Sequence, residues 1–163
     1  MPSTDRIEKK VLLRAPHARV WKAISDSSQF GAWFGVKFDA PFVAGKVMIG
    51  SMTGTTVDAE IAARQLQHKG RPFEFVIDRI EPMRLFSFRW HPFAIEVNVD
   101  YSKEPTTLVT FELEEVADGT MLTISESGFD RIPLGRRASA FARNDAGWTA
   151  QAKLIEKFIA HAA

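Results

Sequence analysis

The sequence contains no cysteine, no long apolar run and no excess of one charge. Without cysteine, it excludes a disulfide scaffold, a thiolate zinc site, a cysteine nucleophile and a cysteine-ligated iron–sulfur cluster. The 21 Lys and Arg stand against 20 Asp and Glu, a formal net charge of +1. This balance disfavours non-specific binding to nucleic acid or to an anionic membrane, because each needs a broad basic surface.

No apolar run approaches the ~20 residues that a membrane-spanning helix needs, and the N-terminus is polar. We therefore expect a cytoplasmic protein. Its 163 residues, 45% hydrophobic and 25% charged, predict one globular domain over residues 1–163. The aromatic residues are 13 Phe and 4 Trp with a single Tyr. Since nearly all these rings lack a hydroxyl group, we expect most of them to face an interior.

The N-terminal third predicts a strand followed by two short helices. Apolar residues alternate over residues 7–13, as in a half-buried strand. Pro16 suits the start of a helix, where its missing N–H costs nothing. A second short helix begins at the capping candidate Asp26, passes through Phe30, and ends at Gly35.

Two hairpins are expected in the middle of the chain. Asp118-Gly119 favours a two-residue turn, and Pro82-Met83 marks a second turn. The pairs expected on the inner face are Leu113 with Ile124, Phe111 with Glu126, Phe75 with Trp90, and Ile77 with Phe88. The pairs expected on the outer face are Glu112 with Ser125, Glu114 with Thr123, Asp78 with Ser87, and Val76 with Arg89. Both hairpins predict an antiparallel sheet with one buried face.

Two further segments carry patterns of their own, one before the hairpins and one at the C-terminus. Residues 55–70 fit a strand, a short helix or a pocket-covering loop. After Pro133 the pattern predicts a helix of some 25 residues, with Gly147 indicating close packing or a slight bend. Its predicted inward stripe contains Leu134, Ala138, Phe141, Asp145, Trp148, Ala152, Ile155 and Ile159.

This order of elements resembles the helix-grip fold of the START/SRPBCC superfamily, which includes the birch pollen allergen. The motifs are similar to the bacterial branch named after the activator of the heat-shock-protein-90 ATPase. They are residues 20–21 (VW), 30–34 (FGAWF), 85–90 (LFSFRW), 107–113 (TLVTFEL), 119–124 (GTMLTI) and 126–129 (ESGF). The resemblance implies an α+β fold, with a curled antiparallel sheet wrapped around a long C-terminal helix and a cavity for an apolar ligand. It implies no single reaction, because relatives include binding proteins, cyclases and co-chaperone domains.

Glu126 is the first candidate functional residue, since the register directs it inward beneath the C-terminal helix. A carboxylate in apolar surroundings is costly to ionise unless partners compensate it. Such a group could anchor a ligand or act as a general acid. Alternatively, it lies at the strand end and forms an ordinary salt bridge.

Asn144, Trp148 and Gln151 share one side of the predicted helix. They could orient the polar end of a ligand, or cap neighbouring elements. The remaining candidate ligand-binding residues are aromatic: Trp33, Phe75, Phe88, Trp90, Phe111 and Phe141. Any one of them is more often core, but together they suggest a partly hollow interior of roughly 300–1,000 Å³.

The four histidines lack metal-binding spacing, so no metal is expected, and no motif indicates a cofactor. The basic cluster, Arg131, Arg136, Arg137 and Arg143, is either a solvated face or a docking surface for an acidic partner.

We therefore expect binding of a small apolar or aromatic molecule in an internal cavity. One alternative is a protein-interaction domain that modulates a chaperone ATPase. A further alternative is a cyclase or dehydratase that uses Glu126 or His91, although the sequence contains no complete catalytic motif.

Overall fold

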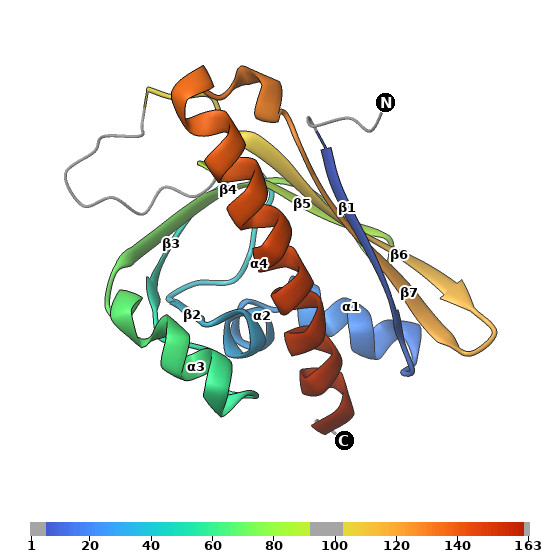
Figure 1. The fold of residues 1–163 in the computed structure, drawn as a ribbon. Coiled ribbons are helices and arrows are strands. Elements are labelled where there is room, and N and C mark those ends of the chain that lie inside the picture. The colour runs from blue at the N-terminus through green and yellow to red at the C-terminus, as the bar shows by residue number, and fades with distance from the viewer. Residues whose placement is uncertain (1–5, 92–102, 162–163) are drawn as a thin grey trace.

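Seven strands form one antiparallel sheet that curls around a long C-terminal helix (Figure 1). The computed structural model describes residues 6–91 and 103–161. The strands are β1 (Arg6–Leu13), β2 (Val36–Phe38), β3 (Val47–Met52), β4 (Pro72–Glu81), β5 (Leu85–Trp90), β6 (Thr107–Val116) and β7 (Gly119–Ser127), in the spatial order β1-β7-β6-β5-β4-β3-β2. The α-helices are α1 (His17–Ser25), α2 (Ser27–Phe34), α3 (Ala59–Gln65) and α4 (Leu134–His161), and the 3₁₀ turns are η1 (Leu66–His68) and η2 (Phe129–Arg131). The predicted helix-grip α+β architecture is confirmed.

The first strand and the two short helices are confirmed. Pro16 precedes α1, and the Asp26 carboxylate accepts the N–H groups of Ser28 at 2.9 Å and Gln29 at 3.0 Å to start α2. Gly35 ends α2 with φ at 99°, a conformation that glycine adopts without a Cβ penalty. These local signals therefore turn the chain back under the sheet, where α2 contacts α4.

The β6–β7 register differs from the expected one by two residues. Phe111 lies opposite Ile124 and Val109 opposite Glu126, because the two turn residues are Ala117 and Asp118. Gly119 is instead the first residue of β7, where a Cβ would lie 2.3 Å from the Leu13 carbonyl oxygen. A two-residue shift keeps every side chain on its face, so the predicted inner face is correct and the predicted partners are wrong.

The β4–β5 hairpin follows the prediction only on one side of an irregularity. Ile77 lies opposite Phe88 as expected, and Val76 opposite Arg89. A bulge at Asp78 then shifts the ladder, so that Ser87 lies opposite Arg79 instead of Asp78. The Ser87 hydroxyl still donates to the Asp78 carboxylate at 3.0 Å.

The uncertain segment 55–70 contains a short helix, α3. The Asp58 carboxylate accepts the N–H of Ile61 at 2.9 Å, which caps the first turn. The same carboxylate pairs with Lys157 of α4. The polar N-cap therefore also ties α3 to the C-terminal helix.

The predicted stripe of α4 is only partly correct. Trp148 and Ile155 face the sheet, whereas Leu134 is 79% exposed and Ala138 is exposed. The first turn of α4 projects past the strands in Figure 1. Asp145 forms an ion pair with Lys9 of β1 at 2.9 Å.

No helix among residues 6–91 and 103–161 is long and apolar enough to cross a membrane.

Candidate functional site

The Glu126 carboxylate lies at the centre of a polar network inside the aromatic core. Its side chain is fully buried on β7, on the inner face that strand alternation predicts. Oε2 accepts a hydrogen bond from the indole Nε1 of Trp90 at 2.7 Å and from the Thr107 hydroxyl at 2.5 Å. Oε1 accepts from the indole Nε1 of Trp148 at 2.8 Å. The Asn144 amide donates to both oxygens, at 2.9 and 3.1 Å.

This set of partners suits an ionised carboxylate. Indole and amide N–H groups only donate, and an ionised carboxylate only accepts. All these donors are neutral, and the ion pairs of the described residues do not include Glu126. The structure therefore compensates a buried charge with oriented hydrogen bonds instead of the salt bridge considered from sequence.

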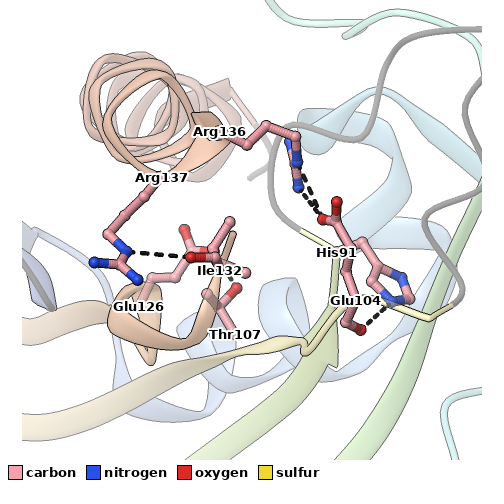
Figure 2. Close-up of polar contacts among 7 residues, drawn as sticks. All are labelled: His91, Glu104, Thr107, Glu126, Ile132, Arg136 and Arg137. Carbon is pink, nitrogen blue, oxygen red and sulfur yellow. Dashed lines mark hydrogen bonds and ion pairs between the residues drawn. The ribbon is translucent and has the colours of Figure 1, made fainter. Parts of the chain in front are cut away.

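Two arginines of the basic cluster lie near this site but are directed elsewhere (Figure 2). The Arg136 guanidinium forms hydrogen bonds of 3.0 and 2.8 Å with the Glu104 carboxylate. Arg137 donates to the carbonyl oxygens of Ile132 at 3.2 Å and Asp130 at 2.8 Å. Arg136 and Arg137 of the predicted acidic-partner surface thus form hydrogen bonds within the chain.

A small pocket of about 90 Å³ lies beside the Glu126 network, where the end of α2, the end of β5 and the middle of α4 meet. Its lining residues are Phe34, Trp90, Asn144, Gly147, Trp148 and Gln151. The Trp90 and Trp148 ring centroids are 5.6 Å apart, and the Phe34 ring is 6.3 and 6.2 Å from them. Three of the six lining residues are thus aromatic.

Three of the lining side chains are held by Glu126. Trp90, Asn144 and Trp148 each turn their N–H groups to its carboxylate. Glu126 itself is not a lining residue. Its position therefore fixes the orientation of the walls, and a molecule in the pocket would contact those walls and not the carboxylate.

Gln151 contributes an amide with one unsatisfied atom. Its Nε2 lies 3.4 Å from the Phe34 carbonyl oxygen, which orients the amide. Its Oε1 is buried and has no hydrogen-bond partner among the described residues. A buried acceptor without a partner is uncommon in proteins, and it identifies a position where a donor would be stabilised.

The structure divides the predicted site residues into four groups. The first group lines the pocket: Trp90, Asn144, Trp148 and Gln151. Glu126 lies behind the pocket, and Phe141 packs on Phe129 with ring centroids 5.1 Å apart. The last group lies in the core and is at most 1% exposed: Trp33, Phe75, Phe88 and Phe111. Phe34 was not among the predicted site residues, and Gly147 was expected to mark close packing or a slight bend. A Cβ at Gly147 would meet nothing within 4 Å, so this glycine keeps the pocket edge free of a side chain.

Many of the aromatic rings expected to line a partly hollow interior pack closely against one another. The Phe75 and Phe88 rings are 4.3 Å apart, and Phe30 makes an edge contact with Trp33 at 4.9 Å. Aromatic rings fill space efficiently in such tilted and edge contacts, so the excess of rings produces a packed core. The pocket of about 90 Å³ lies at one side of α4.

No cluster of three or more potential metal ligands occurs among residues 6–91 and 103–161. The His91 ring contacts the Glu104 carbonyl oxygen at 3.1 Å, and the His17 ring contacts the Met83 carbonyl oxygen. The side chain of His161 lies outside the described residues.

The curled antiparallel sheet around a long C-terminal helix defines a helix-grip protein of the START/SRPBCC class. The family model described as "Activator of Hsp90 ATPase homolog 1-like protein" matches residues 14–160, and the chain belongs to this family.

Solved structures support the fold. A protein from Arthrobacter aurescens has a TM-score of 0.73 and 18% identity, covering 100% of this chain and 91% of that chain. A Mesorhizobium loti protein has a TM-score of 0.70 and 17% identity, covering 97% and 98%. DynU16, from the dynemicin biosynthetic locus, has a TM-score of 0.68 and 24% identity, covering 98% of this chain and 48% of DynU16, so this chain spans about half its length. No curated protein matches the sequence.

Proposed function

We propose that the protein binds a small organic molecule, one end of which enters the pocket between α2, β5 and α4. The observation that carries this proposal is the common attachment of Trp90, Asn144 and Trp148 to Glu126. Pocket walls that are already oriented lose little conformational entropy when a ligand binds. The network therefore pre-organises an aromatic surface next to an unsatisfied amide oxygen.

The size of the pocket limits what it holds. Pockets for drug-sized molecules usually measure about 300–1,000 Å³, whereas this pocket measures about 90 Å³. It accommodates a group of a few atoms, and the rest of a larger ligand would extend past the exposed Gly147. We therefore expect a ligand that is anchored at one end instead of the fully enclosed ligand expected from the sequence.

Two leucine substitutions on α4 test this proposal. Gly147→Leu places a side chain over the pocket, whereas Gly135→Leu places one in the first turn of the same helix. A Cβ meets nothing within 4 Å at either position, so both variants should fold. Protein purified from its natural host would be analysed by native mass spectrometry for retained ligand.

We expect wild type and Gly135→Leu to retain the same additional mass, and Gly147→Leu to lose it. Equal retention by all three proteins would show that the ligand binds elsewhere. If no ligand is retained, binding is tested instead by titrating the protein with a library of amines, alcohols, acids and aromatic compounds while its Trp fluorescence is followed. No binding in that titration would overturn the proposal.

The family description favours a second candidate, modulation of the Hsp90 ATPase. This candidate predicts that saturating protein changes the ATPase rate of the Hsp90 from the same organism. An unchanged ATPase rate would rule out this second candidate function. Gly147→Leu should leave any such effect intact, because a protein-docking surface does not depend on the pocket, and this separates the two candidates.

The observed geometry gives little support to a cyclase or dehydratase function. Glu126 is occupied by four hydrogen-bonding residues, and neither Glu126 nor His91 lines the pocket. A general acid must come within hydrogen-bond reach of the group that it protonates. The geometry supports Glu126 as a positioning residue.

A further inference from the structure

The aromatic walls of the pocket favour a positively charged ligand. The indole N–H edges of Trp90 and Trp148, their most positive parts, are directed at Glu126. Together with Phe34, these rings account for three of the six residues that line the pocket. The faces of aromatic rings attract ammonium groups, and tryptophan does so most strongly.

The buried charge of Glu126, behind the pocket walls, also favours a positively charged ligand. Glu126 is fully buried and its described partners are all neutral donors. A charge in the interior is screened less than one in water, so its field extends into the adjacent pocket. An anionic group entering the pocket would be repelled, and a cationic group would be stabilised.

The amide groups at the pocket provide acceptors. Gln151 directs Nε2 at the Phe34 carbonyl, which leaves the unpaired Oε1 on the other branch of the amide. Asn144 directs Nδ2 at Glu126, so its oxygen likewise points away from the carboxylate. An alkyl group would leave the Gln151 oxygen unsatisfied, whereas an N–H donor would satisfy it.

We propose that the pocket receives the protonated amino group of a small organic amine. This inference rests on the proposed function and names the chemical class of its ligand. On binding, the Gln151 amide turns so that its Oε1, which is buried in the free protein, accepts the ammonium N–H groups. The charge lies against Phe34, Trp90 and Trp148, and Glu126 supplies the counter-charge from behind the wall. The carbon chain of the amine leaves the pocket beside Gly147.

Three probes of similar size separate charge from hydrogen bonding. Isobutylammonium carries both a positive charge and N–H donors, isobutanol carries a donor without a charge, and tetramethylammonium carries a charge without a donor. Each would be titrated at pH 7 while the indole N–H signals of the protein are followed by NMR. We expect isobutylammonium to bind about tenfold more tightly than isobutanol, within the range of desolvated cation–π interactions.

Two variants locate the binding. Gln151→Leu should weaken isobutylammonium about tenfold and leave tetramethylammonium nearly unchanged, because only the first ligand donates to the amide oxygen. Leucine is a strong helix former, so this variant should remain folded. Gly147→Leu should abolish binding of both cations, whereas Gly135→Leu should leave it unchanged.

The outcomes distinguish this inference from the proposed function. If isobutanol binds as tightly as isobutylammonium and Gly147→Leu blocks both, the pocket binds ligands but the ammonium inference is overturned. If none of the probes binds, or if binding survives in Gly147→Leu, the ammonium inference is also overturned. The retained-ligand experiment then decides the proposed function by itself.

Discussion

Trp90 at the end of β5 and Trp148 in the middle of α4 donate their indole N–H groups to different oxygens of one carboxylate, with ring centroids 5.6 Å apart. The carboxylate belongs to Glu126 on β7. One buried charge therefore connects two strands and the long helix at the place where the pocket forms. This connection leads to the first prediction.

Glu126→Gln should destabilise the protein by about 3 kcal/mol, because the new amide nitrogen would face N–H donors and leave buried donors without an acceptor. Urea denaturation measures the change. Glu114→Gln is the matched control, since Glu114 is exposed on the neighbouring strand, and it should change the free energy of unfolding by less than about 0.5 kcal/mol. Equal unfolding midpoints for the two variants would contradict a structural role of the network.

Asp58 should make the stability of α3 depend on pH. The Lys157 hydrogen bond, followed by the Ile61 N–H, holds the pKa of Asp58 below its ordinary value of 3.8. A lowered folded-state pKa contributes stability above the unfolded-state pKa, and this contribution is lost as pH falls through the folded-state value. Amide hydrogen exchange in α3 should therefore be faster in Asp58→Asn than in wild type at pH 6, and the difference should shrink progressively as the pH falls below 3.8.

Asp39→Asn serves as the control for this measurement, because Asp39 is exposed outside the helices and strands. It should leave α3 exchange unchanged at both pH values. A difference between Asp58→Asn and wild type that persists undiminished at low pH would contradict an ionised cap.

Two glycines on helices should respond oppositely to alanine. Gly147→Ala should stabilise the protein by up to about 1 kcal/mol, because a Cβ there meets nothing within 4 Å and alanine favours helix. At Gly31 of α2, a Cβ would lie 2.1 Å from the Val36 carbonyl oxygen. Gly31→Ala should therefore destabilise it by about 1–3 kcal/mol. Thermal unfolding checks both values, and a shift of the same sign would be inconsistent with these contacts.

Two leucines of α4 should differ in their contribution to stability. Leu154 is fully buried and Leu134 is 79% exposed. Leu154→Ala should cost about 2–5 kcal/mol, since it removes buried methyl groups and leaves a cavity. Leu134→Ala should cost less than about 0.5 kcal/mol. Urea denaturation of the pair tests the orientation of the helix, and similar costs would contradict it.

The local signals in the sequence predict the short helices well. Pro16, Asp26 and Gly35 act through their own backbone and nearest neighbours, so their effects are visible without the rest of the fold. The hairpin register is harder to predict. Gly119 looks like a turn residue, but it begins β7, where the close approach of the Leu13 carbonyl oxygen from another strand leaves no room for a Cβ.

The inward direction of Glu126 follows from strand alternation alone, because faces survive a register shift of two residues. Its partners do not follow from the sequence. Trp90, Thr107, Asn144 and Trp148 come from three different elements, and only their packing brings four donors to one carboxylate. Phe34 was missed for the same reason, since it lies on α2 and meets α4 only in the folded chain.

The sequence by itself determined the family, the order of elements and the burial of most rings, because these depend on local propensity and on the period of the apolar pattern. Only the tertiary structure decided which rings pack against one another and that a pocket of about 90 Å³ lies beside α4. The physical reason is that cavity volume is the small difference between the space enclosed by the elements and the volume of the side chains packed in it. That difference depends on how rings from distant segments interlock, which composition does not contain.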